Sequence, residues 1–254
     1  MRWLLAAGFI LAAASTSAHG EGSCKAPKEL VSFAAPLPNL ARALSTQRVA
    51  RIVTLGSSST AGSGASSPNA SYPSRLDAEL DGRYRGHEFQ VTNLGAGGQL
   101  ASDMLERLEL EVLPQAPALV IWQTGVNDAV QDVGVDKFRE TLKTGIEQLK
   151  AAGIDVILVD MQYYPRSERV AGYGDYLSAM RKVAEEEKIP LFRRFLIMKH
   201  FLKSGQYTSD QLLAPDNFHL NDLSYGCLAM LLADAIEIQL ARAQILRDHV
   251  VASH

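Results

Sequence analysis

Apolar residues along the chain fall into five short runs rich in aliphatic and β-branched side chains, separated by longer stretches with apolar residues every three or four positions. Short runs of this kind predict buried strands, and the longer spacing predicts helices with one apolar face. The predicted strands are Ala50–Leu55, Glu88–Leu94, Ala118–Thr124, Asp155–Asp160 and Pro190–Phe195. The predicted helices are Tyr72–Leu80, Ala101–Leu113, Val135–Ala152, Tyr173–Glu187 and Asp222–Leu246.

Strands that alternate with helices predict an α/β fold, in which a parallel sheet is covered by helices on both faces. In such a sheet the functional loops gather beyond the carboxyl ends of the strands. The segment Glu21–Gln47 lacks clear periodicity and contains three prolines. We therefore expect an N-terminal arm over residues 19–47 that packs across a single domain formed by residues 48–254.

A serine-rich turn, Leu55–Gly62, follows the first predicted strand and is matched much later by Asp216 and His219. A serine hydroxyl becomes a good nucleophile when an imidazole takes its proton, and a carboxylate keeps that imidazole in the required tautomer. Ser58, His219 and Asp216 can fill these three roles. The turn taken alone is equally compatible with an ordinary loop of small residues.

Two further loops supply groups that could bind a negatively charged oxygen. Asn93–Gln99 contains Gly98, and Gln123–Asp128 contains Asn127, and each loop follows an apolar run. A tetrahedral intermediate of acyl transfer carries an oxyanion, and each well-placed backbone or amide N–H lowers the barrier by roughly 3–4 kcal/mol. These residue types therefore strengthen the interpretation of the serine turn as a nucleophile.

With these four blocks in order, the chain resembles the SGNH hydrolase family, also called GDSL-type esterases and lipases, from about Val53 to Ala229. The resemblance implies a three-layer α/β/α, flavodoxin-like fold with a parallel five-stranded sheet. It implies that Ser58 is the nucleophile and that His219 and Asp216 are the base and its orienting carboxylate. It also implies an oxyanion hole formed by Ser58, Gly98 and Asn127, with Gly97 as the alternative to Gly98.

The serine block departs from the family at one position. The family usually has an aspartate before the nucleophile, and this chain has Ser57. That aspartate is a supporting hydrogen-bond acceptor outside the triad, and we expect the Ser57 hydroxyl to accept instead, without the strength of a charged group. Three consecutive serines leave the nucleophile ambiguous, and Gly56 and Thr60, which match the family's flanking residues, place it at Ser58.

The first 18 residues have a short basic start, an apolar stretch of about a dozen residues and a small-residue end, as in a secretory signal peptide. We expect cleavage after Ala18, with Gly20 as the alternative, and export to the periplasm or the extracellular space. No lipid anchor is expected, because Cys24 lacks the preceding apolar residue of a lipoprotein signal. No later run reaches the about 20 apolar residues that span a bilayer.

The chain has 254 residues, 47% of them hydrophobic, and a formal net charge of −3. Lys and Arg are mixed with Asp and Glu, so neither nucleic acid nor an anionic membrane surface is expected as a partner. The histidines and cysteines form no metal-ligand pattern, and Gly95–Gly98 falls short of a dinucleotide-binding fingerprint. The sequence therefore predicts no metal and no cofactor, and it carries no signal for an oligomeric state.

The two cysteines, Cys24 and Cys227, favour one disulfide between the arm and the last helix if the protein is exported. A loop of that length would contribute roughly 4–5 kcal/mol in the entropic treatment. The alternative is a buried free thiol, because Cys227 lies on the apolar face of that helix, four residues from Leu223 and from Leu231.

These features predict an exported serine esterase that forms an acyl-enzyme on Ser58. The loops Met161–Gly174 and Ser204–Phe218 are expected to line the substrate cleft with polar and aromatic residues. Four tyrosines in these loops could line the cleft or pack the loops onto the core: Tyr163, Tyr164, Tyr173 and Tyr207. Without an insertion long enough for a lid, we expect short acyl groups, with acetylated carbohydrate as a candidate substrate. The alternatives are acetyl transfer to a sugar hydroxyl, a lysophospholipase or thioesterase, and an inactive binding scaffold.

The choice of Ser58 among three serines predicts a simple labelling result. A fluorophosphonate probe, which reacts with activated serines, should label the wild-type protein and fail to label Ser58→Ala. Ser57→Ala and Ser59→Ala should keep most of the labelling, because neither removes the nucleophile. Labelling that survives Ser58→Ala and disappears in a neighbouring variant would show that another serine reacts.

Overall fold

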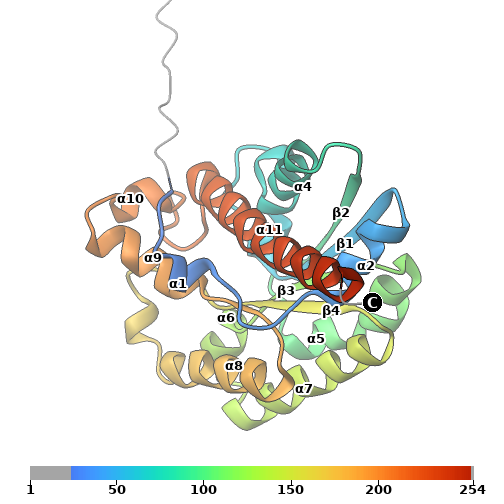
Figure 1. Ribbon diagram of the computed structural model, residues 1–254. Coiled ribbons are helices and arrows are strands. Elements are labelled where there is room, and N and C mark those ends of the chain that lie inside the picture. The colour runs from blue at the N-terminus through green and yellow to red at the C-terminus, as the bar shows by residue number, and fades with distance from the viewer. Residues whose placement is uncertain (1–23, 253–254) are drawn as a thin grey trace, which may run out of the picture.

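The computed structural model of the protein describes residues 24–252, with side chains up to Leu246. The predicted signal peptide, residues 1–18, lies outside the described residues. One five-stranded sheet forms the centre, in the order β2-β1-β3-β4-β5, and each neighbouring pair is parallel (Figure 1). Its strands are β1 Val49–Gly56, β2 Glu88–Gly95, β3 Leu119–Gln123, β4 Asp155–Val159 and β5 Leu191–Phe192.

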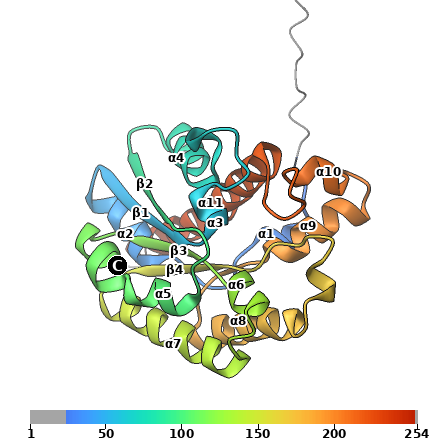
Figure 2. The same ribbon diagram turned by 180° about the vertical axis from the view of Figure 1, so that it is seen from behind.

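Helices cover both faces of the sheet, which confirms the predicted three-layer fold. One group, α1, α2, α4 and α11, covers one face, and the group α5 to α8 covers the other; α4 and α11 lie above the sheet and α7 and α8 below it in both Figure 1 and Figure 2. The α-helices are α1 Lys28–Val31, α2 Pro38–Thr46, α3 Ser58–Ala61, α4 Tyr72–Arg83, α5 Ala101–Glu106, α6 Val126–Val130, α7 Val135–Ala151, α8 Tyr173–Glu187, α9 Arg194–Lys203, α10 Ser209–Leu212 and α11 Asp222–Ala252.

The central strands are enclosed by this double cover. Every residue of β3 and of β4 is buried, which explains why their sequences are almost continuously apolar. Trp122 on β3 is fully buried, and its indole N–H points at the sulfur of Met104 on α5, 3.1 Å away. The sheet is thus fixed against the helices that carry the loops at its carboxyl edge.

Two predicted elements are shorter than expected. The helix predicted over Ala101–Leu113 is α-helical only to Glu106 and continues as a π-helical turn, Leu108–Val112, and a 3₁₀ turn, Leu113–Gln115. Leu110 is 83% exposed, so its apolar character does not mark a buried helix face. The strand predicted over Pro190–Phe195 is only Leu191–Phe192, because Arg194 already begins α9.

Several shorter helices were not predicted, and α9 and α2 are the longest of them. In α9 the buried residues Ile197, Met198 and Phe201 recur at helical spacing, a pattern that extending the strand to Phe195 obscured. In the arm, α2 starts at Pro38, a residue well suited to the first turn of a helix, and buries Leu40. Both helices are short, and short amphipathic segments carry a weak periodic signal.

The arm is held by hydrogen bonds to distant parts of the chain. The carboxylate of Asp155, at the start of β4, accepts bonds from the Leu40 N–H and the Asn39 amide, both 2.9 Å long. The Phe33 carbonyl accepts a 2.6 Å bond from the Gln239 side chain on α11. These bonds attach the arm to the start of one strand and to the last helix.

The last helix was expected to lack a run long enough for a membrane span, and this expectation was wrong. Among the described residues, Asp222–Leu246 of α11 is long and apolar enough to cross a bilayer by length and composition. In the fold, 67% of its apolar 18-residue window is buried inside the protein. Its apolar character therefore serves the core, where it packs against α4 and α2.

Cys24 and Cys227 are joined by a disulfide, with their Cα atoms 5.4 Å apart, so the arm begins attached to α11. We expect intact-mass measurement of the exported protein, alkylated without reductant, to find no alkylated cysteine. Two alkylated cysteines would contradict the bond and leave Cys227 as a packed core residue.

Candidate active site

The serine turn lies at the carboxyl end of β1, where two glycines allow close packing. A Cβ at Gly56 would overlap the hydroxyl of Thr60, and a Cβ at Gly95, at the end of β2, would overlap the main-chain nitrogen of Ala61. Glycine at both positions therefore lets the short helix α3 sit directly on the ends of β1 and β2. Ser58 is the first residue of that helix.

The structure brings Ser58, His219 and Asp216 together. The Ser58 hydroxyl lies 2.9 Å from His219 Nε2, although the two residues are 161 positions apart. His219 Nδ1 lies 2.6 Å from Asp216 Oδ2. Each ring nitrogen thus faces one partner, which is the geometry required for a base that takes the serine proton and is oriented by a carboxylate.

The loop that carries Asp216 and His219 is folded on itself. Asp216 Oδ1 accepts the backbone N–H groups of Phe218 and His219 at 3.0 and 2.9 Å. Asn217, which lies between Asp216 and Phe218, has φ +54°, a left-handed conformation that asparagine tolerates better than most residues. The Asp-x-x-His spacing therefore forms a compact turn in which the carboxylate holds both the ring and the backbone of the histidine.

These hydrogen bonds also set the charge of Asp216. Partial burial alone would raise its pKa, but the bonds from the His219 side chain and from the two backbone N–H groups outweigh burial and lower the pKa below its ordinary value. Asp216 is therefore ionised throughout the neutral range and can stabilise a protonated imidazole.

The three predicted oxyanion donors lie on neighbouring strand ends. Gly98 follows β2 with φ +78°, and Asn127 lies in α6, directly after β3. The Asn127 amide donates a 2.8 Å bond to the Gln99 carbonyl, which joins its loop to the one that carries Gly98. Within the described residues the Gly98 N–H has no acceptor. Gly97 and Gly98 are both exposed, so the alternative between them stays open.

Two glutamines that the sequence analysis missed hold the neighbours of Ser58. Gln123 Oε1, at the end of β3, accepts bonds from the Ser57 N–H at 3.2 Å, the Ser57 hydroxyl at 3.3 Å and the Thr60 hydroxyl at 3.0 Å. Gln162 Oε1, after β4, accepts the Ser59 hydroxyl at 3.4 Å. The Ser57 hydroxyl, which was expected to accept a hydrogen bond, donates one to Gln123.

This arrangement distinguishes the three serines. Ser57 and Ser59 are 4% and 1% exposed and turn toward the glutamines, whereas Ser58 is partly exposed and faces His219. The signal that could have revealed the glutamines is a polar residue at the end of a buried strand, which must find a partner inside the protein.

Of the four tyrosines expected along the cleft, Tyr164, Tyr173 and Tyr207 are buried, and partly buried Tyr163 packs against Phe195. The ring of Tyr164 lies 4.9 Å from that of Phe218, which in turn lies 4.8 Å from the ring of His219, so this pair packs beside the histidine. Tyr173 is buried and donates to the Gln162 carbonyl, and Tyr207 is buried beside Phe201 and Cys24. The last two therefore pack the core.

Other candidate groups have structural roles or lie elsewhere. Buried Asp128 accepts the Ala101 N–H at the start of α5, a structural role. Among the described residues no cluster of His, Cys, Asp or Glu could hold a metal ion.

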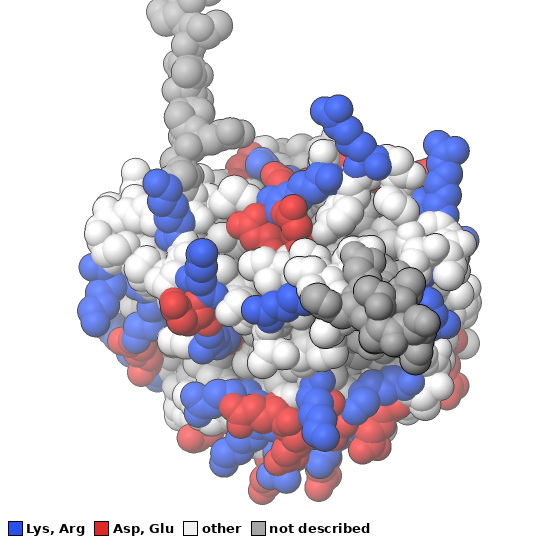
Figure 3. Space-filling view, in the orientation of Figure 1, with Lys and Arg blue, Asp and Glu red and all other residues white. Residues whose placement is uncertain are grey.

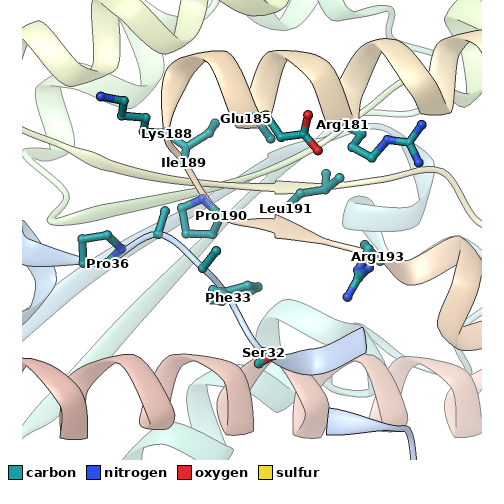
Figure 4. Close-up of a pocket in the computed structure, with 13 residues that line it drawn as sticks. Ser32, Phe33, Pro36, Arg181, Glu185, Lys188, Ile189, Pro190, Leu191 and Arg193 are labelled. Atoms are coloured by element: carbon teal, nitrogen blue, oxygen red, sulfur yellow. The ribbon is translucent and has the colours of Figure 1, made fainter. Parts of the chain in front are cut away.

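A cavity of about 620 Å³ lies between the arm, α8 and β5 and contains none of the predicted site residues (Figure 4). On the face shown in Figure 3, acidic and basic side chains are interspersed.

Comparison with known proteins identifies the family. The chain belongs to the Non-GDSL lipase-like family, whose pattern it matches over residues 23–242, and this confirms the resemblance to SGNH hydrolases. The chain spans 55% and 34% of the length of the two curated relatives that it matches.

Individual relatives agree with this assignment. The chain is 28% identical to Esterase TesA of Pseudomonas aeruginosa over 116 residues. The matched segment covers 44% of this chain and 55% of that protein. The lipase/acylhydrolase from Enterococcus faecalis has 26% identity and a TM-score of 0.63, with 75% and 95% of the two chains covered. A two-domain esterase active on acetylated mannans shares the fold, with 19% identity, a TM-score of 0.69, and 83% and 56% covered.

The lowered pKa of Asp216 predicts how activity depends on pH. Asp216 stays ionised across the neutral range, so activity should reach a plateau there that depends on the charge of Asp216. Asp216→Asn should lower the plateau by about 10³-fold or more, because an amide cannot stabilise the imidazolium. The measurement is kcat/KM against pH for both proteins, and an unchanged profile and plateau in Asp216→Asn would remove Asp216 from the triad.

Proposed function

We propose that the protein is an exported serine esterase that hydrolyses carboxylic esters through an acyl-enzyme on Ser58. The observation that carries this proposal is the continuous contact from the Ser58 hydroxyl through His219 to Asp216, with both neighbouring serines turned into the core. Membership in an esterase-like family supports the same reaction class.

The first half of the reaction acylates the serine. His219 Nε2 takes the proton as Ser58 Oγ attacks the ester carbonyl carbon, and the carbonyl oxygen becomes an oxyanion. The N–H groups of Ser58 and Gly98 and the Asn127 amide stabilise that charge. The intermediate collapses when the bond to the alcohol oxygen breaks, and the imidazolium gives its proton to the leaving alcohol.

The second half releases the acid. Water replaces the alcohol, His219 takes a proton from it, and the resulting hydroxide attacks the acyl carbon to form a second oxyanion in the same site. The bond to Ser58 Oγ then breaks and His219 returns the proton to the serine. Asp216 keeps its charge throughout and holds the ring in the tautomer that accepts at Nε2.

We further propose short acyl groups and a hydroxylated alcohol portion, such as acetylated carbohydrate. Phe218 packs against the ring of His219, and buried Tyr164 packs behind Phe218, so a rigid aromatic pair stands beside the histidine. The partly exposed ring of Phe218 could support one face of a sugar. A structural neighbour of the same fold is active on acetylated mannans, and this is consistent with the proposal.

The substrate proposal is tested with p-nitrophenyl esters from about two to sixteen carbons. Each buried CH₂ contributes about 0.8 kcal/mol, so a long acyl groove would make kcat/KM climb with chain length. We expect a maximum between acetyl and about butyryl. A maximum at about eight carbons or beyond would favour a lysophospholipase or thioesterase, and acetylated sugar products formed when an acceptor is added would show a transferase.

A further inference from the structure

Beneath the serine turn lies a buried cation that the proposed reaction does not use directly. Arg194, the first residue of α9, is 2% exposed, and within the described residues it forms no salt bridge. Its Nη1 has no hydrogen-bond partner there. Burying a charge costs several kcal/mol, and the nearby Asp160 carboxylate offsets only part of this cost, since burial still lowers the pKa of Arg194. An arginine at this place therefore calls for a role beyond packing.

The guanidinium contacts the segment that follows β4. Its Nε donates to the Asp160 carbonyl at 2.9 Å, and its Nη2 donates to Gln162 Oε1 at 3.0 Å. The planar guanidinium of Arg194 thus bonds to both Asp160 and Gln162, two residues apart in the same segment. The Tyr173 hydroxyl fixes the Gln162 carbonyl at 2.6 Å, so both the backbone and the amide of Gln162 are held.

The placement of Arg194 is itself determined by the fold. Asp160 Oδ1 accepts the Phe195 N–H at 2.8 Å, which attaches the start of α9 to the end of β4. Burial raises the pKa of Asp160 to about 7 even though Arg194 and Arg193 oppose this, so this region is strongly desolvated. In such surroundings hydrogen bonds from a charged donor are stronger than at the surface.

The contact reaches the nucleophile through one intermediate. Gln162 Oε1 accepts both Arg194 Nη2 and the Ser59 hydroxyl, and Ser59 is bonded covalently to Ser58. An amide has one acceptor end and one donor end. Because arginine only donates, it forces the oxygen of Gln162, and not the nitrogen, toward Ser59. Without it the amide could rotate and present N–H groups to the serine turn.

We propose that Arg194 is a positioning residue for the nucleophile, acting through Gln162 and Ser59 to hold the serine turn in the conformation that presents the Ser58 hydroxyl to His219. The inference rests on the proposed function, since it assigns Arg194 a role in the reaction of Ser58. Gln123 holds the other side of the same turn through Ser57 and Thr60. Hydrogen bonds from the ends of two adjacent strands, β3 and β4, therefore hold the turn. Arg194 orients the glutamine on the β4 side.

The test is a double-mutant cycle between Arg194→Met and Gln162→Met, with p-nitrophenyl acetate as substrate. Each single variant should lower kcat about tenfold with KM within about twofold, because the loss concerns alignment and not substrate binding. The double variant should be no worse than the more severe single one, since both changes break the same connection. Ser59→Ala should lower kcat about threefold in the wild type and have no effect in Arg194→Met.

A matched control and a second measurement separate positioning from general damage. Arg242→Met removes another arginine that donates to a main-chain carbonyl, that of Phe33, and should leave kcat unchanged. Amide hydrogen exchange over residues 57–63 should be faster in Arg194→Met and Gln162→Met than in Arg242→Met. This measurement does not depend on catalysis. If Arg194→Met does not fold, Gln162→Met and Ser59→Ala, compared with Arg242→Met, carry the test.

The outcomes are distinguishable. Wild-type hydrolysis that persists in Ser58→Ala would overturn the proposed function, and the exchange measurement would then decide the role of Arg194 in the turn. Where hydrolysis depends on Ser58, an unchanged kcat in Arg194→Met, additive effects with Gln162→Met, or unchanged exchange over residues 57–63 would overturn the positioning role. A loss seen in KM alone would likewise overturn it.

Discussion

The hydrogen bond between Ser58 and His219 is the contact on which the candidate site depends. The two side chains come from opposite ends of the chain, and the bond forms only if the end of β1 and the loop before α11 approach within a few tenths of an ångström of the required distance. Gly64 contributes to this approach, because a Cβ there would press against His219 and the Leu220 carbonyl. The parallel sheet and the long buried helix α11 act as the rigid frame for both segments.

Buried side chains are apolar in the interior of the sheet, whereas several are polar at its carboxyl edge. β3 and β4 are mostly apolar and buried, yet β3 ends in buried Gln123, and buried Gln162 lies three residues after β4. Neither glutamine binds the nucleophile itself; both hold its neighbours. Such groups stabilise less than apolar packing would, since they need complete hydrogen bonding to offset desolvation, and Gln123 Nε2 lacks a partner within the described residues. Polar residues at the carboxyl edge of the sheet therefore contribute less to folding stability than apolar residues would, and they fix the conformation of the serine turn.

The arm and the last helix form a second frame around this edge. The disulfide joins the start of the arm to α11, and Asp155 and Gln239 attach the rest of it to β4 and α11. α11 begins only three residues after His219, so whatever steadies that helix also steadies the histidine loop. In this way contacts far from the reacting atoms contribute to the geometry of the site.

The sequence by itself determined the alternation of strands and helices and pointed to the three residues that the structure brings together, Ser58, His219 and Asp216. Runs such as those of β3 and β4 are apolar because both their faces are covered, and this pattern is readable without coordinates. Ser58, Asn127, Asp216 and His219 occur in short motifs whose spacing reflects local turns, which a sequence also encodes. The short helices α2 and α9 escaped detection because a few residues carry too little periodicity.

Only the tertiary structure decided how the separate motifs meet. The roles of Gln123, Gln162 and Arg194 depend on contacts between residues 32 to 103 positions apart, and nothing in the local pattern marks a glutamine as the acceptor for a distant serine. The direction of the Ser57 bond and the exposure of Ser58 alone among three serines likewise follow from packing. Local propensities specify elements and turns, whereas burial and hydrogen-bond partners exist only once distant strand ends lie side by side.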